Sequence, residues 1–406
     1  MRYLRILTIF GTNSNSEQMK ILSVVGARPN FMKIAPFVKA INESNAEHQS
    51  QLIDHLLVHT GQHYDDRMSK QFFYELNIPE ADINLGVGSG SHAEQVGHTM
   101  IEFEKVLRSE KPDWVVVVGD VNATLACSVT AKKELVKCCH IEAGLRSGDL
   151  TMPEEINRLV TDRLCDLLLT PDKIANENLH KEGASDSKIK FVGNIMIDTL
   201  DANFLGAKSK QLSEIIVNNL FDNVKASDYE IEDEQFAVMT LHRPSNVDIK
   251  EVFSSLIDFV TNIVARDLLL IWPIHPRAAK QLQLFDLWNK VTESKNIVLT
   301  KPLGYIDMLR LNMGARVMLT DSGGLQEECT VLGTPCLTLR CNTERPVTLK
   351  KFGGASVLVG NDIDAITREY NLAVSTKRVP CRPELWDGKT AKRCLEAILV
   401  YDRTIL

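Results

Sequence analysis

One stretch of the chain, residues 114–158, constrains the fold most strongly. Its apolar run Trp114–Val118 contains four consecutive valines and ends two residues before Asp120. Such an unbroken run is typical of a parallel strand that is covered on both faces. A second apolar run ends at Ile141 and is followed by Glu142. Ligands bind beyond the carboxyl ends of such strands, so both acids are candidate site residues, although either could instead cap a helix or form a structural ion pair.

Strand-like and helix-like segments alternate along the whole chain from residue 19. Besides the two runs above, strands are expected at 21–25, 56–60, 167–170, 189–192, 236–241, 268–274, 296–299, 317–319, 336–339 and 356–359. Helical segments separate them, including expected helices at 66–76 and 92–109. This alternation predicts βαβ units and parallel sheets. The predicted fold class is α/β, with two doubly wound Rossmann-like domains facing a central cleft.

A length of 406 residues is long for one hydrophobic core, so two domains are expected. The first is predicted to span residues 19–200 and the second residues 201–385. Residues 1–18 are interpreted as an appended segment, with an extra edge strand as the alternative. Residues 386–406 contain a helix with one apolar face, and the sequence does not say which domain this face contacts.

Composition excludes several classes of function. The net charge of −7 argues against broad binding to nucleic acid or to an anionic membrane surface. No apolar run approaches the roughly 20 residues of a membrane span, and no secretory leader is recognisable. The nine cysteines include no C-x-x-C pair, so we expect buried thiols in a reducing cytoplasm.

A candidate phosphate site lies in the second half, in the segment 320–328. There Ser322, Gly323 and Gly324 follow an apolar strand and open a helix. Glycines permit close approach of the backbone, and a helix N-terminus offers free N–H groups and a positive dipole. The alternative is an ordinary Asp or Ser cap followed by a glycine turn. Glu328 lies one turn further on, where a sugar hydroxyl could meet it.

Cations and histidines also follow predicted strands. Arg28 and Lys33 lie at the first strand–helix junction, and Arg345 follows the strand at 336–339. Together they suggest an anionic ligand that spans the cleft, although each alone could be a solvated charge. His242 and His275 could each bind phosphate or transfer a proton, or could be structural.

Several motifs are missing from the sequence. No G-x-G-x-x-G follows the first strand, and no Walker A sequence, nucleophile elbow or calcium loop is present. The chemistry is therefore expected to be acid/base work on an anionic substrate, with no nicotinamide cofactor and no obligatory metal.

These residues together resemble the non-hydrolysing UDP-N-acetylglucosamine 2-epimerases. The similarity runs from residue 19 to about residue 399, and the motifs occur in the family's order. The matching motifs are Gly26-Ala27-Arg28-Pro29, Thr60-Gly61-Gln62-His63, Gly119-Asp120, 140–146, 153–158, His242-Arg243, 320–328 and 343–346. Any one of them is a weak signal, but the ordered set is specific. The resemblance implies a glycosyltransferase-B type fold and a cytoplasmic homodimer.

The resemblance also implies the reaction, which is the interconversion of UDP-GlcNAc and UDP-ManNAc. In this family UDP is eliminated to give 2-acetamidoglucal and is then added back with the opposite configuration at C2. The residues carried over as catalytic are Asp120, Glu142, Glu154 and His242. Those carried over as substrate contacts are Arg28, Lys33, His242, Ser322, Gly323, Gly324, Glu328 and Arg345. Which carboxylate serves which face of C2 stays open.

The sequence departs from the family pattern at a few positions. Asn30 and Val347 each stand where an acid is usual. The variant around Asn30 is shared with relatives acting on UDP-2,3-diacetamido-2,3-dideoxyglucuronate, so a 2-epimerase of that sugar is an alternative. In some bacterial members a second UDP-GlcNAc binds as an activator, and the matching positions here are Gln62, His63 and His275.

Two further alternatives stay open. A glycosyltransferase of the same fold would move the sugar to an acceptor, but it needs one main base and would leave the other carboxylates unexplained. A non-catalytic sensor of nucleotide sugars would bind the same ligand without turnover.

Overall fold

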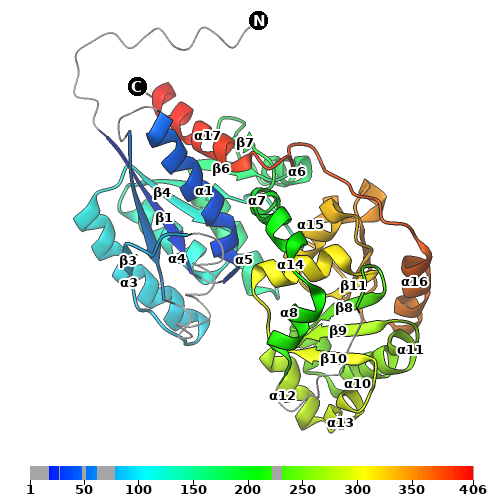
Figure 1. The fold of residues 1–406 in the computed structure, drawn as a ribbon. Helices are drawn as coiled ribbons and strands as arrows, with labels where there is room; N and C mark the ends of the chain where they lie inside the picture. The colour runs from blue at the N-terminus through cyan, green and yellow to red at the C-terminus, as the bar shows by residue number, and fades with distance from the viewer. Residues whose placement is uncertain (1–17, 27, 48–51, 62–77, 222–230, 406) are drawn as a thin grey trace, which may run out of the picture.

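The computed structural model describes residues 18–26, 28–47, 52–61, 78–221 and 231–405. These residues form two α/β halves that lie side by side, each built on its own sheet (Figure 1). The expected helix at 66–76 and all but the last residue of the segment 1–18 lie outside the described residues.

The N-terminal half is built on a parallel sheet with the strand order β3-β2-β1-β4-β5-β6-β7. Its strands are β1 Met19–Val25, β2 Ile53–His59, β3 Ile83–Asn84, β4 Trp114–Val118, β5 Lys137–Ile141, β6 Leu167–Thr170 and β7 Ile189–Phe191. Its helices are α1 Arg28–Glu47, α3 His92–Glu110, α4 Asn122–Lys133, α5 Pro153–Leu164, α6 Lys173–Lys181 and α7 Ile195–Ser209. The expected strands are confirmed, but the two-residue strand β3 was not expected.

The valine run of β4 has the environment that its composition predicts. Every residue of β4 is inaccessible to solvent. Val116 and Val118 pack in the apolar cluster on one face of the sheet, and Val115 and Val117 pack in the cluster on the other face. A strand covered on both faces has no polar side, which explains why this run does not alternate.

The C-terminal half repeats this architecture with the parallel order β10-β9-β8-β11-β12-β13. Its strands are β8 Phe236–Thr240, β9 Leu269–Pro273, β10 Ile297–Thr300, β11 Val317–Thr320, β12 Cys336–Thr338 and β13 Ser356–Leu358. Its helices are α8 Leu212–Asn219, α9 Pro244–Val247, α10 Lys250–Phe259, α11 Ala265–Asp267, α12 Pro276–Leu284, α13 Trp288–Thr292, α14 Tyr305–Gly314, α15 Gly323–Leu332 and α16 Ile363–Ser375. The expected two doubly wound domains are therefore confirmed.

The strand orders place a topological switch point in each sheet. In the N-terminal sheet β1 lies between β2 and β4, and in the C-terminal sheet β8 lies between β9 and β11. Crossovers leave such a central pair of strands in opposite directions, which opens a crevice at their carboxyl ends. The segments after β1, β4 and β5 in one sheet and after β8, β11 and β12 in the other carry most of the candidate residues, so topology brings these candidates to the crevices.

Two helices join the halves. Helix α7 spans the predicted boundary at residue 200 and contacts α1 as well as α14 and α15. Helix α17, Thr390–Ile405, returns from the C-terminal half and packs on α1 and α7, which answers the question of which half its apolar face contacts (Figure 1). The Asp198 carboxylate of α7 accepts the backbone N–H groups of Thr390 and Ala391 and so fixes the start of α17.

Two surface properties complete the fold. All nine cysteines are free, but the expectation that they are buried is wrong for Cys341, which is exposed, and only partly right for Cys381. Both lie in loops of the C-terminal half, Cys341 after β12 and Cys381 after α16. Among the helices that the structure describes, none has the length and apolarity needed to cross a membrane.

Candidate active site

The first turns of α1 bring a cation to the crevice of the N-terminal sheet. Lys33 is buried, and its Nζ donates a hydrogen bond to Glu142 Oε2. Asn30, which replaces the acid usual in the related family, donates from Nδ2 to the carbonyl of Val118 at the end of β4. A carboxylate could not donate this bond, so the amide fits its local surroundings. Arg28 opens α1, but its side chain lies outside the described part of the chain.

Glu142 follows β5 in a strained conformation. Its φ of 73° lies in the left-handed region, which costs a residue with a Cβ on the order of 1–3 kcal/mol and is concentrated at functional sites. The side chain is buried, and Oε2 is bound by Lys33. Among the described residues Oε1 has no hydrogen-bond partner. Glu142 thus has one oxygen held by a cation and a second that could exchange a proton.

Asp120 follows β4 and is held by α5. Its Oδ2 accepts hydrogen bonds from Nε and a second nitrogen of Arg158, with the Nε contact at 3.1 Å. Asn157 donates to the Asp120 carbonyl at 2.8 Å. Burial raises the pKa of Asp120, but the positive charges of Arg158, Lys33 and Arg345 outweigh it, so this pKa lies below its usual value. Asp120 is therefore ionised at neutral pH.

Glu154 approaches the cleft from the first turn of α5. Its Oε1 lies 3.8 Å from a guanidinium nitrogen of Arg243, which belongs to the other half. Pro153 occupies the first helical position, and an acid in the first turn is also favoured by the helix dipole. The position therefore suits both a helix-stabilising acid and a catalytic one, and the ion pair across the cleft distinguishes Glu154 from an ordinary capping residue.

In the C-terminal half, the turn before α15 leaves backbone donors available. Ser322 is the N-cap of α15, but no side chain caps this helix. The buried Asp321 carboxylate instead accepts the backbone N–H groups of His242 at 3.0 Å and Arg243 at 2.9 Å and the side-chain amide of Asn246 at 3.1 Å. The alternative of an ordinary Asp or Ser cap is thus wrong. An uncapped helix start of this kind can bind an anion.

His242 is oriented by the same aspartate. Its Nδ1 lies 2.7 Å from Asp321 Oδ1. Burial raises the pKa of Asp321, but hydrogen bonding and attraction to His242 lower it below its usual value. An ionised carboxylate only accepts hydrogen bonds, so Nδ1 carries a proton and Nε2 is the nitrogen left for a ligand.

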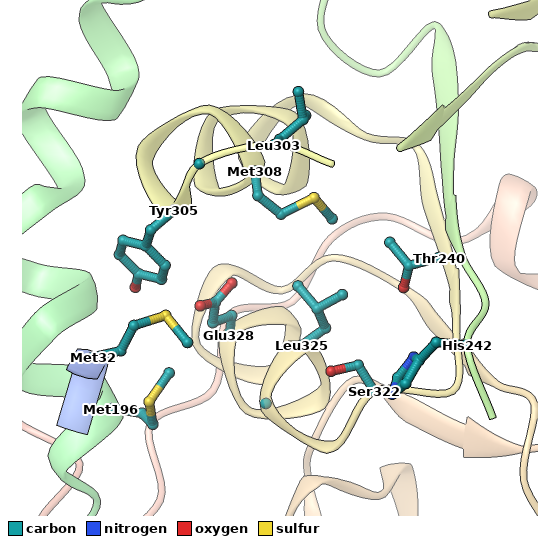
Figure 2. Close-up of a pocket in the computed structure, with 12 residues that line it drawn as sticks. Met32, Met196, Thr240, His242, Leu303, Tyr305, Met308, Ser322, Leu325 and Glu328 are labelled. Carbon is teal, nitrogen blue, oxygen red and sulfur yellow. The ribbon is translucent and has the colours of Figure 1, made fainter. Parts of the chain in front are cut away.

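A pocket of about 250 Å³ lies where the two halves meet (Figure 2). Tyr305 and Glu328 lie at one end of it, and Ser322 and His242 lie at the other. Its lining residues are Met32, Met196, Thr240, His242, Leu303, Gly304, Tyr305, Met308, Ser322, Gly324, Leu325 and Glu328. It is smaller than the roughly 300–1,000 Å³ of a site for a whole ligand, so it would hold one part of a nucleotide sugar.

Among the residues that the structure describes, the hydrogen-bond partners of Glu328 are neutral groups rather than cations. Burial raises its pKa to about 7, and hydrogen bonds from Asn312 and Tyr305 only partly offset that effect. A carboxyl group of this kind is partly protonated at neutral pH, so it can both donate and accept hydrogen bonds. This property suits a contact with sugar hydroxyl groups.

Arg345 connects the acids of one half with the helix start of the other. Its Nε lies 2.8 Å from Glu327 Oε1, a second nitrogen donates to Glu344, and a third lies 3.9 Å from Glu142 Oε2. A Cβ added to Gly323 would lie 2.6 Å from the guanidinium. One guanidinium therefore touches both Glu142 and the turn that opens α15. The gap between the halves brings together a carboxylate, a cation and an anion-binding helix start.

His140 and His275 have structural partners. His140 is fully buried and uses both ring nitrogens, with Nδ1 2.6 Å from Asp162 and Nε2 2.8 Å from the Gly119 carbonyl. His275 caps α12 by accepting the backbone N–H of Arg277, and its ring lies 5.8 Å from that of His242. Of the predicted regulatory residues, Gln62 and His63 lie outside the described residues, so only His275 is placed, next to the candidate site.

Sequence reasoning missed five residues that complete the site. They are Arg158, Asn194, Tyr305, Glu327 and Glu344. Three of them stand inside the matching motifs, but their residue types alone gave no reason to expect a buried ionic cluster. In the described part of the chain, no group of three or more His, Cys, Asp and Glu side chains is arranged to hold a metal ion.

Comparison with known proteins gives a consistent result. A family model described as UDP-N-acetylglucosamine 2-epimerase matches residues 45–399. The UDP-N-acetylglucosamine 2-epimerase of Methanocaldococcus jannaschii is 39% identical over 386 residues, covering 95% of this chain and 100% of that protein. The UDP-2,3-diacetamido-2,3-dideoxy-D-glucuronate 2-epimerase of Pseudomonas aeruginosa is 36% identical, covering 92% and 97% of the two chains.

A solved structure agrees with these relatives. The crystal structure of the M. jannaschii UDP-GlcNAc 2-epimerase in complex with UDP-GlcNAc and UDP has a TM-score of 0.83 and 40% identity. The match covers 94% of this chain and 100% of that one. The family model covers far more than half of the chain, and the named relatives extend over nearly all of it. This chain therefore belongs to the UDP-N-acetylglucosamine 2-epimerase family and is an isomerase of that family.

Proposed function

We propose that the protein interconverts UDP-GlcNAc and UDP-ManNAc by anti elimination of UDP and re-addition at the opposite face. The observation that carries the proposal is the position of Arg345, whose guanidinium touches both Glu142 and the turn before α15. An elimination that expels a diphosphate needs a base at C2 and positive charge at the leaving group. The relatives' names and the bound UDP-sugar of the M. jannaschii enzyme support this substrate class.

In the first step a carboxylate removes the C2 proton while the C1–O bond breaks. The C–H electron pair becomes the C1–C2 double bond of 2-acetamidoglucal, and the bonding pair of C1–O leaves with UDP. Lys33, Arg345, His242 and the free N–H groups of α15 would stabilise the developing charge on the diphosphate. Preorganised donors of this kind each contribute roughly 10²–10³-fold in rate.

Re-addition reverses these steps, except that C2 receives its proton on the other face. UDP attacks C1, and a proton is delivered to C2 from the opposite face. Glu142, Asp120 and Glu154 are the candidates for the two proton transfers, because two faces of one carbon need two acid/base groups or a turning intermediate. Each group of this kind typically supplies 10²–10⁴-fold. Glu328 would bind the ribose hydroxyls of the nucleotide.

Incubation with UDP-GlcNAc in D₂O tests the proposal. The expected result is deuterium at C2 of both UDP-GlcNAc and UDP-ManNAc, measured by NMR and mass spectrometry. Formation of UDP-ManNAc without solvent label would contradict the elimination. Transfer of the sugar to an acceptor with C2 unlabelled would instead support a glycosyltransferase. UDP-sugar binding without any exchange would support a non-catalytic sensor.

A second sugar is favoured by one observation. The P. aeruginosa relative that acts on UDP-2,3-diacetamido-2,3-dideoxy-D-glucuronate is 36% identical to this chain, close to the 39% of the M. jannaschii enzyme. Parallel D₂O incubations with both sugars would separate the two substrates, because only the true substrate should exchange at C2 on the time scale of turnover. The homodimer and cytoplasmic location implied by the resemblance stay predictions, and light scattering would measure the oligomeric state.

A further inference from the structure

A buried acid, Glu327, lies between the two halves and has no role in the chemistry described above. It projects from α15 and is 1% exposed. Its Oε1 lies 2.8 Å from Arg345 Nε and accepts a hydrogen bond of 2.8 Å from Asn194 Nδ2. Among the described residues Oε2 has no hydrogen-bond partner. One oxygen of this carboxylate therefore makes both contacts.

The contact with Asn194 connects Glu327 to the N-terminal half. Asn194 is fully buried and is the N-cap of α7, where its Oδ1 accepts the backbone N–H of Met196 at 2.9 Å. Because the amide oxygen is used in capping, the Nδ2 donor must face the other way, toward Glu327. Helix α7 also packs on α15. The geometry of the helix cap in one half thus fixes the position of the carboxylate in the other.

The contact with Arg345 determines how that guanidinium is aimed. Nε forms an ion pair with Glu327, although its N–H is not aligned for a hydrogen bond there, and the other two nitrogens are directed at Glu344 and toward Glu142. A planar guanidinium paired with acids on several sides cannot rotate freely. The guanidinium is therefore fixed beside Gly323, where the leaving diphosphate of the proposed reaction would lie.

We propose that Glu327 is a positioning residue that aims Arg345 at the leaving diphosphate and, through Asn194, makes this aim depend on the packing of the two halves. This inference rests on the proposed function for the identity of the leaving group. Burial raises the pKa of Glu327 to about 7 and the charge of Arg345 only partly opposes this, so the carboxyl group is partly protonated at neutral pH and its pairing with Arg345 favours the ionised form.

The proposal predicts a separation between binding and catalysis. Glu327 is an acid close to an anion site, so its replacement by a neutral amide should leave the electrostatic attraction for UDP unchanged or stronger. The same change should loosen Arg345 and weaken an interaction that matters most when the diphosphate leaves. A residue that only supported the fold would instead weaken both together.

Glu327→Gln and Asn194→Ser are the two variants that test this. Gln keeps the size and an acceptor oxygen but removes the charge. Ser keeps a good N-cap for α7 but lacks the amide that reaches Glu327. Asp198→Asn is the matched control, since Asp198 is also a buried carboxyl group, but it accepts backbone N–H groups at the start of α17 and, among the described residues, forms no hydrogen bond or ion pair with Arg345.

Glu327→Gln should lower kcat by roughly 10- to 100-fold, as expected for a misplaced catalytic group, while the Kd for UDP stays the same or falls. Asn194→Ser should have a smaller effect of the same kind, and the double variant should lose less than the product of the two single losses. The control should keep its kcat even though its melting temperature falls. Retention of kcat in Glu327→Gln, additive losses, or equal losses of UDP affinity and kcat would overturn the proposal.

One readout does not depend on turnover. The ³¹P NMR shift of the β-phosphate of bound UDP should move toward the value of free UDP in Glu327→Gln and Asn194→Ser, but not in Asp198→Asn. If the wild-type protein shows no C2 exchange, the proposed function fails, and this shift still decides whether Glu327 aims Arg345. An unchanged shift in both variants, or no UDP binding by the wild-type protein, would overturn the inference. If Glu327→Gln does not fold, Asn194→Ser gives the same two measurements.

Discussion

The two halves of the molecule each bring a buried acid to the shared gap, but the pKa values of these two acids are shifted in opposite directions. In the N-terminal half, burial raises the pKa of Asp120, but Arg158, Lys33 and Arg345 reverse that effect. In the C-terminal half, burial raises the pKa of Glu328 to about 7, and only neutral hydrogen-bond donors oppose it. The difference lies in the partners, since cations surround the first acid and an amide and a phenol contact the second.

The two pKa shifts suit the two acids to different tasks. An acid that stays ionised can act as a base at neutral pH and can return a proton only when charge develops beside it. An acid that is partly protonated is better suited to hydrogen bonding with hydroxyl groups. The N-terminal half thus carries the reactive carboxylates, and the C-terminal half recognises the nucleotide in the proposed reaction.

The largest effect is expected when Arg158, the cation that binds Asp120, is replaced. Arg158→Met should destabilise the protein by about 3–5 kcal/mol, because Asp120 and Glu155 would lose a buried partner. Urea unfolding followed by circular dichroism measures the loss. Arg277→Met is the matched control, since its partner Asp248 is on the surface and the pair should contribute only about 0–1 kcal/mol. Equal losses in both variants would show that the ionic cluster does not hold Asp120.

A somewhat smaller effect is expected at Glu142, the proposed catalytic carboxylate. Glu142→Gln should lower kcat by at least ~10²-fold with little change in KM, because the amide cannot exchange a proton as a carboxylate does. Steady-state kinetics with UDP-GlcNAc measures both constants. A large rise in KM with normal kcat would reassign Glu142 to binding and remove the distinction between the two halves.

Glu328 should make stability depend on pH. Its folded pKa of about 7 lies above the usual 4.5, so the folded state binds the proton more tightly than the unfolded state. Its contribution is therefore fully present below about pH 4.5 and is lost as the pH rises through 7, a change on the order of 3 kcal/mol. Glu328→Gln should gain stability relative to wild type between pH 5 and pH 8, as measured by thermal unfolding. A pH-independent difference would contradict the raised pKa.

Glu155 should make stability depend on pH in the opposite direction. Burial raises its pKa, but backbone N–H groups of Ser147 and Gly148 and the charge of Arg158 lower it below the usual value. Its stabilising contribution is thus present above the unfolded pKa and lost as the pH falls through the folded pKa. On acidification, wild type should therefore lose stability relative to Glu155→Gln. Over the same change in pH, wild type should gain stability relative to Glu328→Gln, and thermal unfolding of all three proteins measures both differences.

The smallest effect is expected at the helix start in the C-terminal half. A Cβ at Gly323 would lie 2.5 Å from Glu344 Oε1 and 2.6 Å from Arg345, but a Cβ at Gly324 would meet nothing within 4 Å. Gly323→Ala should destabilise the protein by about 1–3 kcal/mol, and Gly324→Ala should stay within about 0.5 kcal/mol of wild type. Urea unfolding of the pair tests whether the guanidinium is fixed where the structure places it.

Much of the fold could be predicted from local patterns. The valines of β4 are too apolar for a half-exposed strand, and the alternation of strands and helices leaves parallel sheets as the natural solution. The same reasoning placed Asp120, Glu142 and His242 at strand ends, since strand ends can be seen in the sequence. The turn at Ser322 was also found, although the sequence alone could not decide between a capped and an uncapped helix.

Other features depend on pairs of residues that are far apart in the chain. Arg158 is buried between Asp120 and Glu155, and nothing in its local sequence distinguishes it from a solvated arginine. The contact of Glu327 with Asn194 joins residues 133 positions apart. Helix α17 had an apolar face in the sequence, but its partner could be identified only from its packing on α1 and α7.

The sequence by itself determined the two sheets, the order of the candidate residues and the edge at which each one lies, because these follow from periodicity and from where apolar runs end. Only the tertiary structure decided which acids are paired with cations, which acids are partly protonated and which arginine connects the halves. The physical reason is that charge state depends on distances between side chains across a buried interface, and sequence spacing does not encode those distances.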